Sequence, residues 1–157
     1  MDGQRRAALV AQYEAGPAVL RAAVAGLGES ELDRRPSDGG WTPREVVHHV
    51  ADSEMTSAIR LRRLIAEDEP LIVGYDGDEF ARRLHYADRP IAPALAAVEA
   101  ARATTAQILH GLTEAEWARM GTHSDSGTYG VQEWLETYAV HCHDHADQIS
   151  RVLAAEV

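Results

Sequence analysis

The segment of residues 131–155 has a strong helical pattern, and it limits the possible folds more than any other feature of the chain. Its apolar residues recur at steps of three and four, which is the period of a helix with one face against a core. They are Trp134, Leu135, Tyr138, Cys142, Ile149, Val152 and Leu153. The pattern therefore predicts a long C-terminal helix with a core-facing side.

Two histidines interrupt this apolar face. His141 and His145 are four residues apart, so their rings lie one turn apart on the same face and can converge on a single ion. His143 lies about 200° around the helix from His141, and we expect it to face water. A buried polar ring needs a partner. From this helix alone, a metal ion and a pair of core histidines bound by carbonyls or carboxylates are both open.

Three further segments have helical periodicity, namely residues 4–27, 43–67 and 93–110. Gly16-Pro17 interrupts the first of them. Proline lacks an amide hydrogen and its ring clashes with the preceding turn, so we expect this helix to kink there or to split in two.

The second of these helices has a well-marked start. Thr42 can cap it, Pro43 suits its first position, and Glu45 completes a Thr-x-x-Glu capping box. Trp41 precedes the cap and could pack back on Val46 as a hydrophobic staple.

Two long connections separate the helices. Residues 71–89 hold a short helical turn, and a connection of this length in a small domain is usually functional, often as a lid. Residues 120–129 are expected to form a second loop. With four helices and no strand-like alternation, we predict an all-α protein, a four-helix bundle with long connections that forms a single domain of residues 1–157.

Composition excludes several classes of function. The net charge of −10 argues against a nucleic-acid partner, because phosphate contacts dominate such binding. No apolar run approaches the ~20 residues of a membrane span, so we expect no membrane partner. Cys142 is the single cysteine, which excludes an internal disulfide and fits a cytoplasmic location. The chain has no lysine, which excludes mechanisms that need a lysine Schiff base.

A stable zinc-like site needs at least one more ligand than the histidine pair supplies. The candidates elsewhere in the chain are His48, His49, His85, His110 and His123. His49 lies on the apolar side of the second long helix, beside Val50. His48 is turned about 100° from it and is expected at the surface or in a supporting role. His49 is therefore the better third ligand by geometry.

Two motifs carry a family resemblance. They are Gly39-Gly-Trp-Thr-Pro-Arg-Glu-Val-Val-His-His-Val-Ala-Asp-Ser53 and Tyr138-Ala-Val-His-Cys-His-Asp-His-Ala-Asp-Gln-Ile149. Together they closely resemble the DinB/YfiT-like family, in particular the YfiT branch of metal-dependent hydrolases, which includes bacillithiol S-transferases.

The resemblance has consequences for fold, site and assembly. It implies a four-helix bundle, usually a homodimer, that binds one divalent metal ion per chain, nickel or zinc, in a cleft. The implied ligands are His49, His141 and His145. This chain departs from the branch at Ser124, where members often carry proline, and Cys142 is not a family feature.

Three neutral nitrogen ligands leave an open coordination position, which is typical of a catalytic site. An ion there can lower the pKa of bound water to about 7, which favours hydrolysis, or the pKa of a bound thiol, which favours S-transfer. We expect a metal-dependent enzyme that joins a small electrophile to a low-molecular-weight thiol, with bacillithiol as the first candidate. A hydrolase of small amides or esters, or a stress protein that binds a metal or ligand without turnover, are the alternatives.

Other polar residues have candidate roles beside the ligands. Asp52 or Asp144 could orient a ligand imidazole, or each could be an exposed helix charge. Tyr75 and Asp76, on the first long connection, could line the cleft and bind the thiol, or serve loop packing. His123 could bind substrate or act as an acid or base, or be an exposed loop histidine. The metal rather than a protein nucleophile would supply the activation, and Cys142 is expected to point away from it.

Overall fold

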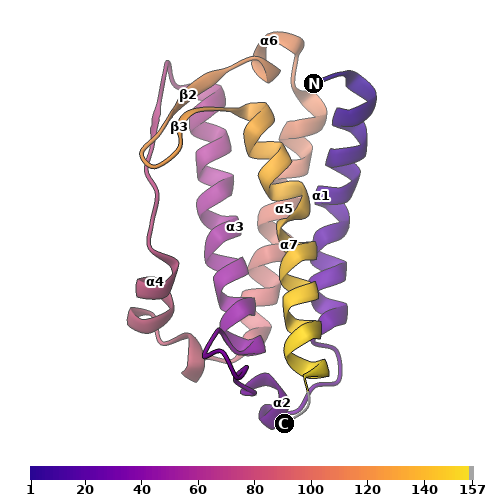
Figure 1. The fold of residues 1–157 in the computed structure, drawn as a ribbon. Coiled ribbons are helices and arrows are strands. Elements are labelled where there is room, and N and C mark those ends of the chain that lie inside the picture. Colours follow the sequence, from indigo (N-terminus) through magenta and orange to yellow (C-terminus); the bar gives the residue numbers. More distant parts are fainter. Residues whose placement is uncertain (156–157) are drawn as a thin grey trace.

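The computed structural model describes residues 1–155, and four long helices dominate it (Figure 1). They are α1 (Gly3–Ala23), α3 (Pro43–Ala66), α5 (Ile91–Gly111) and α7 (Val131–Ala154). Each packs against two others in the cyclic order α1, α7, α3, α5. The expected four-helix bundle is confirmed.

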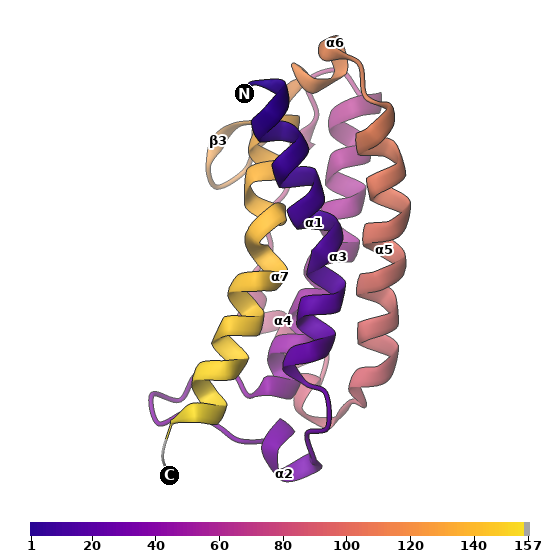
Figure 2. The same ribbon diagram turned by 90° about the vertical axis from the view of Figure 1, so that its right-hand side faces the viewer.

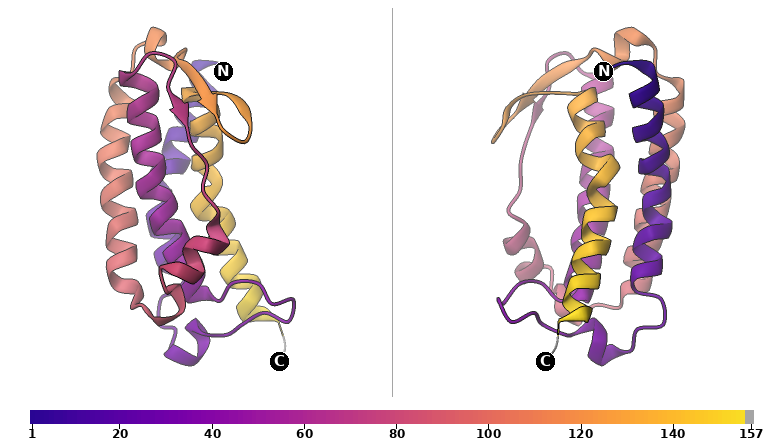
Figure 3. Two further views of the ribbon diagram at one scale, coloured as in Figure 1. Left: turned by 90° about the vertical axis from the view of Figure 1, so that its left-hand side faces the viewer. Right: turned by 45° about the vertical axis from the view of Figure 1, so that its right-hand side comes forward.

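The direction of the helices makes the bundle unusual. In Figure 1, α1 and α7 run downward, whereas α3 and α5 run upward side by side. The chain that leaves the upper end of α3 must therefore return along the whole bundle before α5 begins (Figure 3). We call this return segment, residues 67–90, the crossover. It contains β1 (Leu71–Ile72), α4 (Gly77–Arg83) and a 3₁₀ turn, η1 (Tyr86–Asp88), and it packs on α3.

The second long connection differs from the expected loop. Residues 120–129 lie in a hairpin of β2 (Met120–His123) and β3 (Gly127–Gly130), and β1 of the crossover adds parallel to β2. Leu71 pairs with Thr122, and Ile72 pairs with His123. The strands are too short to show an alternating pattern in the sequence, and β1 has its partner about fifty residues away, so only the fold reveals them. Gly127, with φ of +78°, allows the tight turn.

Two other expectations about helix ends have different outcomes. The capping box of α3 is present, because the Thr42 hydroxyl accepts from the Glu45 amide and the Glu45 carboxylate accepts from the Thr42 amide. Of the kink and the split expected at Gly16-Pro17, the split is wrong, because α1 is one continuous helix with Pro17 inside it. Two single-turn helices, α2 (Glu29–Leu32) and α6 (Glu114–Trp117), complete the fold.

The core consists of two apolar clusters at different heights along the four long helices, which Figure 2 shows from the side. One includes Tyr13, Leu64 and Trp134, and the other includes Leu20, Val47 and Ile149. Polar side chains of α3 and α5 lie at positions between them, among them Glu54, Ser57, Arg102 and Thr105, all buried. No helix within residues 1–155 has both the length and the apolar character that crossing a membrane requires.

Candidate metal centre

Three histidines from two helices come together near the middle of the bundle. His49 of α3 and His141 and His145 of α7 each offer one nitrogen, and these three nitrogens lie within 4.8 Å of one another. The rings of His141 and His145 have centroids 4.6 Å apart, and that of His49 lies 4.8 Å from His145. Three imidazole nitrogens at this spacing fit a divalent transition metal ion. We call these residues the histidine cluster.

Burial keeps two rings of the cluster, those of His49 and His145, neutral. Burial and the neighbouring rings of His145 and His141 lower the pKa of His49 to about 3. Burial, followed by the proximity of His141, lowers the pKa of His145 to about 4. At neutral pH both rings therefore carry a free lone pair, which is the form that binds metal.

Each ring is held by a different neighbour. His49 packs on Trp41, with ring centroids 4.5 Å apart, so Trp41 supports the candidate ligand rather than acting only as a staple. Gly77 of α4 lies beside both rings, since a Cβ there would lie 3.3 Å from Trp41 Cη2 and 3.7 Å from His49 Nδ1. The Nδ1 atom of His145 lies 2.8 Å from Gln148 Oε1, an acceptor that leaves its other nitrogen for a ligand role.

Glu54 supports His141 and was missed by the sequence reasoning. Its Oε1 lies 3.5 Å from His141 Nδ1 and 2.7 Å from Arg102 Nη2, and its side chain is fully buried. Burial raises the pKa of Glu54, but the His141 contact and the Arg102 charge outweigh it and hold the pKa below its usual value. The sequence could have indicated that Glu54 is buried, because it lies on the same face of α3 as the buried residues Val50 and Leu61.

Asp52 does not have the expected role. Its carboxylate accepts from the Tyr86 hydroxyl at 2.5 Å, so it holds η1 of the crossover and not an imidazole of the cluster. His48 is also not at the surface. It is 2% exposed, packs on Tyr86, and has Nε2 3.0 Å from the Arg89 carbonyl oxygen. Asp52 and His48 thus fasten the crossover to α3.

Three other residues of this part of α7, namely His143, Asp144 and Cys142, lie outside the cluster. His143 does not face water as expected, because its Nε2 lies 3.0 Å from the Gln12 carbonyl oxygen of α1. Asp144 is exposed. Cys142 is fully buried, with Sγ 3.8 Å from Glu54 Oε1, and burial raises the pKa of its thiol to about 12. A protonated, enclosed thiol is a poor nucleophile.

A cleft of about 240 Å³ opens beside His49. The crossover contributes Tyr75 to its wall and the β2–β3 hairpin contributes His123, so both candidates line the cleft beside His49. The other lining residues are Ser53, Arg60, Gly74, Gly77, Asp125 and Tyr138. Asp76 does not line this cleft. Its carboxylate accepts from the amides of Asp78 and Glu79 and caps α4.

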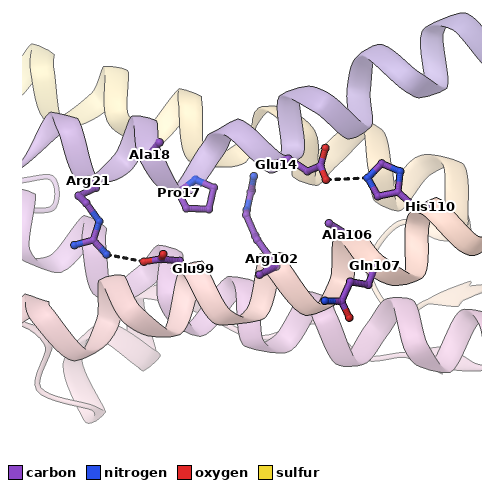
Figure 4. A pocket seen from close by; sticks show the side chains of 10 residues that line it. Glu14, Pro17, Ala18, Arg21, Glu99, Arg102, Ala106, Gln107 and His110 are labelled. Carbon is purple, nitrogen blue, oxygen red and sulfur yellow. Dashed lines mark hydrogen bonds and ion pairs between the residues drawn. The ribbon is translucent and has the colours of Figure 1, made fainter.

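A larger cavity lies elsewhere. It has a volume of about 450 Å³ and runs between α1 and α5 (Figure 4). The pairs Glu14–His110 and Arg21–Glu99 bridge its two helices at 2.8 and 2.9 Å. None of the histidine cluster lines it, so its size does not make it the reactive site. Convergent nitrogen donors identify the smaller cleft instead.

A helical bundle in which three histidines of two helices converge, one of them in the wall of a cleft, defines a candidate metalloprotein. Residues 12–149 match the family model described as DinB superfamily, and the chain belongs to that superfamily. A relative from Oceanobacillus iheyensis, named "Putative metal-dependent hydrolase OB0782", is 34% identical over 134 residues, which is 85% of this chain and 77% of that protein.

The Bacillus subtilis relative gives both a sequence and a structural match. Named "Putative metal-dependent hydrolase YfiT", it is 32% identical over 137 residues, 87% of this chain and 77% of that protein. The solved structure of YfiT is described as a probable metal-dependent hydrolase with an unusual four-helix bundle topology. It superposes with a TM-score of 0.91 at 29% identity, covering 97% of this chain and 87% of that one.

Proposed function

We propose that this chain is a divalent-metal-dependent enzyme that binds one nickel or zinc ion through His49, His141 and His145. The observation that carries the proposal is the convergence of three imidazole nitrogens within 4.8 Å of one another beside a cleft. The names of the relatives, which describe metal-dependent proteins, support it. A divalent ion with three histidine ligands lowers the pKa of a water or thiol that it binds and so supplies a nucleophile at neutral pH.

The reaction we propose is transfer of a low-molecular-weight thiol, with bacillithiol as first candidate, to a small electrophile. A new carbon–sulfur bond forms, the leaving group departs with its electron pair, and the thiol proton is released. The chain itself offers no thiol for this step, since Cys142 is enclosed and protonated. A supplied thiol is therefore required.

The cleft residues have distinct roles in this proposal. Tyr75 binds the thiol or the electrophile. His123 Nδ1 accepts from the Asp125 amide at 3.2 Å, so in that tautomer Nε2–H is free to donate to a substrate atom. Arg60 is held by the Val73 carbonyl at 2.7 Å and the Tyr138 hydroxyl at 3.2 Å, and it brings positive charge to the wall. The homodimer and the cytoplasmic location remain predictions.

The second candidate function is hydrolysis of small amides or esters. The specific observation in its favour is that the relatives and the solved structure carry the description of metal-dependent hydrolase. The same cluster and cleft serve both reactions, so the nucleophile must be determined by assay.

The deciding assay supplies monochlorobimane to the metallated protein with and without a thiol. Conjugation, with loss of chloride, is expected only when thiol is present, at a rate that differs among bacillithiol, mycothiol and glutathione. It should be lost in His141→Ala and largely retained in Cys142→Ser.

The alternatives give different results. Metal-dependent cleavage of amides or esters that proceeds without thiol and survives excess bacillithiol would replace the transferase with the hydrolase. Absence of metal-dependent turnover with either substrate panel would leave a metal- or ligand-binding protein.

A further inference from the structure

We propose that Glu54 and Arg102 are positioning residues that hold His141 in the tautomer and orientation needed to bind metal, and that Gly16-Pro17 of α1 makes room for them. This inference rests on the proposed metal site. It extends the site from three histidines to a chain of contacts through α3, α5 and α1.

The first contact in the chain is between His141 and Glu54. Their atoms Nδ1 and Oε1 are 3.5 Å apart, slightly beyond an ordinary hydrogen bond. Both His141 Nδ1 and Glu54 Oε2 are buried and have no hydrogen-bond partner among the described residues. The ring nitrogen lacks a partner, and the carboxylate beside it still has one oxygen, Oε2, without a donor, so the two groups are placed to form a bond when a metal fixes the ring. Histidine ligands commonly donate their second N–H to such a carboxylate.

The second contact fixes Glu54. Arg102 Nη2 donates to Glu54 Oε1 at 2.7 Å and to the Tyr138 carbonyl at 2.7 Å, and Arg102 is 1% exposed. A buried ion pair contributes little net stability compared with apolar side chains of similar volume, because both charges lose their hydration. Stability alone therefore does not explain an arginine and a glutamate placed between two apolar clusters.

The third contact explains the sequence of α1. Pro17 has no amide hydrogen, so it cannot donate to the carbonyl of Tyr13 four residues earlier. Arg102 Nη1 donates to that carbonyl instead, at 2.5 Å, and its guanidinium lies over the Tyr13 ring. A Cβ at Gly16 would overlap the Arg102 guanidinium. Figure 4 shows Arg102 reaching from α5 to α1 beside Pro17.

The consequence concerns the proton on His141. With Nδ1–H directed to Glu54, the lone pair is on Nε2, which leaves that nitrogen as the metal ligand. The carboxylate also makes the ring a stronger donor. Without Glu54, the His141 ring can change its tautomer and rotate. Metal binding must then fix both the tautomer and the orientation of the ring.

The first test needs no variant and no metal. In ¹⁵N NMR of the metal-free protein at pH 7.5, we expect His141 to carry its proton on Nδ1. A His141 ring protonated on Nε2 would overturn the proposal, whatever the outcome of metal binding.

The second test measures zinc affinity by competition with a chelator. Glu54→Gln/Arg102→Met removes both charges together, so neither is left buried without its partner. The Tyr13 and Tyr138 carbonyls lose their Arg102 donor, so we expect a lower melting temperature than that of the wild type but a folded helical bundle. Its zinc Kd should be weaker by about 10- to 100-fold, with the Nδ1–H preference of His141 lost. Glu14→Gln is the matched control, since Glu14 contacts His110 at the surface, and its zinc Kd should stay within twofold.

The outcomes are distinct. Zinc affinity and tautomer like those of the wild type in the double variant would show that the pair is only structural. If the double variant does not fold, Glu54→Gln alone is measured by the same criteria. If His49→Ala, His141→Ala and His145→Ala all bind zinc like the wild type, the proposed metal site fails, while the tautomer result for metal-free His141 still stands or falls separately.

Discussion

At the residue scale, helical direction decides which histidines of α7 can meet. His141 and His145 point to the cluster with His49, and His143 points to α1 and contacts the Gln12 carbonyl oxygen. All three are only partly exposed, so burial does not separate them. What distinguishes His143 from the other two is its direction, because each residue of a helix is turned by 100° from the one before it.

The metal content of single variants tests this separation. We expect purified protein to hold close to one divalent ion per chain, and His49→Ala, His141→Ala and His145→Ala each to lose it. His143→Ala should keep it. Elemental analysis that shows loss in His143→Ala and retention in His141→Ala would contradict the geometry.

The pH dependence of stability tests the environment of His49. Its pKa is about 3 in the fold and about 6.5 in an unfolded chain, so between these values the unfolded state binds more protons. The metal-free protein should therefore be most stable above pH 6.5 and lose stability as the pH falls. Between pH 6.5 and 5, the protonation of His49 in the unfolded chain should lower the free energy of unfolding by about 2 kcal/mol. Denaturant titrations should show a smaller loss in His49→Gln, and an equal loss would mean that His49 titrates normally.

At the element scale, α1 remains whole across Pro17 because another helix supplies the missing donor. Arg102 of α5 bonds the Tyr13 carbonyl that Pro17 leaves free, and Gly16 leaves space for the guanidinium. A residue pair that usually ends a helix is here the place where a neighbouring side chain enters it.

Alanine at two glycines of α1 tests this packing. A Cβ at Gly16 would overlap Arg102 and lie 2.9 Å from Cys142 Cβ, whereas a Cβ at Gly3 would meet nothing within 4 Å. Gly16→Ala should cost about 1–3 kcal/mol of unfolding free energy and weaken metal binding, because it displaces Arg102. Gly3→Ala should leave both unchanged or stability slightly raised. Thermal unfolding curves that coincide for the two variants would refute this account of Gly16.

At the scale of the whole molecule, topology brings the site together. The parallel neighbours α3 and α5 require the crossover, and the crossover supplies Gly77 and Tyr75 beside His49. The β1–β2 pairing joins it to the hairpin that carries His123. The candidate site is thus built from two helices of the bundle and flanked by two connections.

Removal of the metal by a chelator tests whether the fold depends on the metal. The two apolar clusters contain none of the three candidate ligands, so the bundle should stay helical without metal. An ion at 1,000 times its Kd contributes about 4 kcal/mol, so its removal should lower the melting temperature by roughly 8–16 °C. Circular dichroism at 25 °C should be unchanged. Loss of the helical signal on chelation would show that the metal is structural.

The sequence by itself determined the helices and the pairing of His141 with His145. Periods of three and four residues and the box at Thr42 and Glu45 are local properties, so the long helices were predicted to within a few residues at most ends. His49 as partner also followed from its place on the apolar side of α3, together with the family resemblance.

Only the tertiary structure decided which polar groups serve those histidines. Glu54 and Arg102 lie far apart in the chain and meet because α3 and α5 are neighbours. Asp52, expected beside a ligand, is bound by Tyr86 of the crossover, and the strands at β1 and β2 exist only because the crossover passes the hairpin. Helical periodicity gives the direction of a side chain, whereas its partner depends on which distant segment packs there.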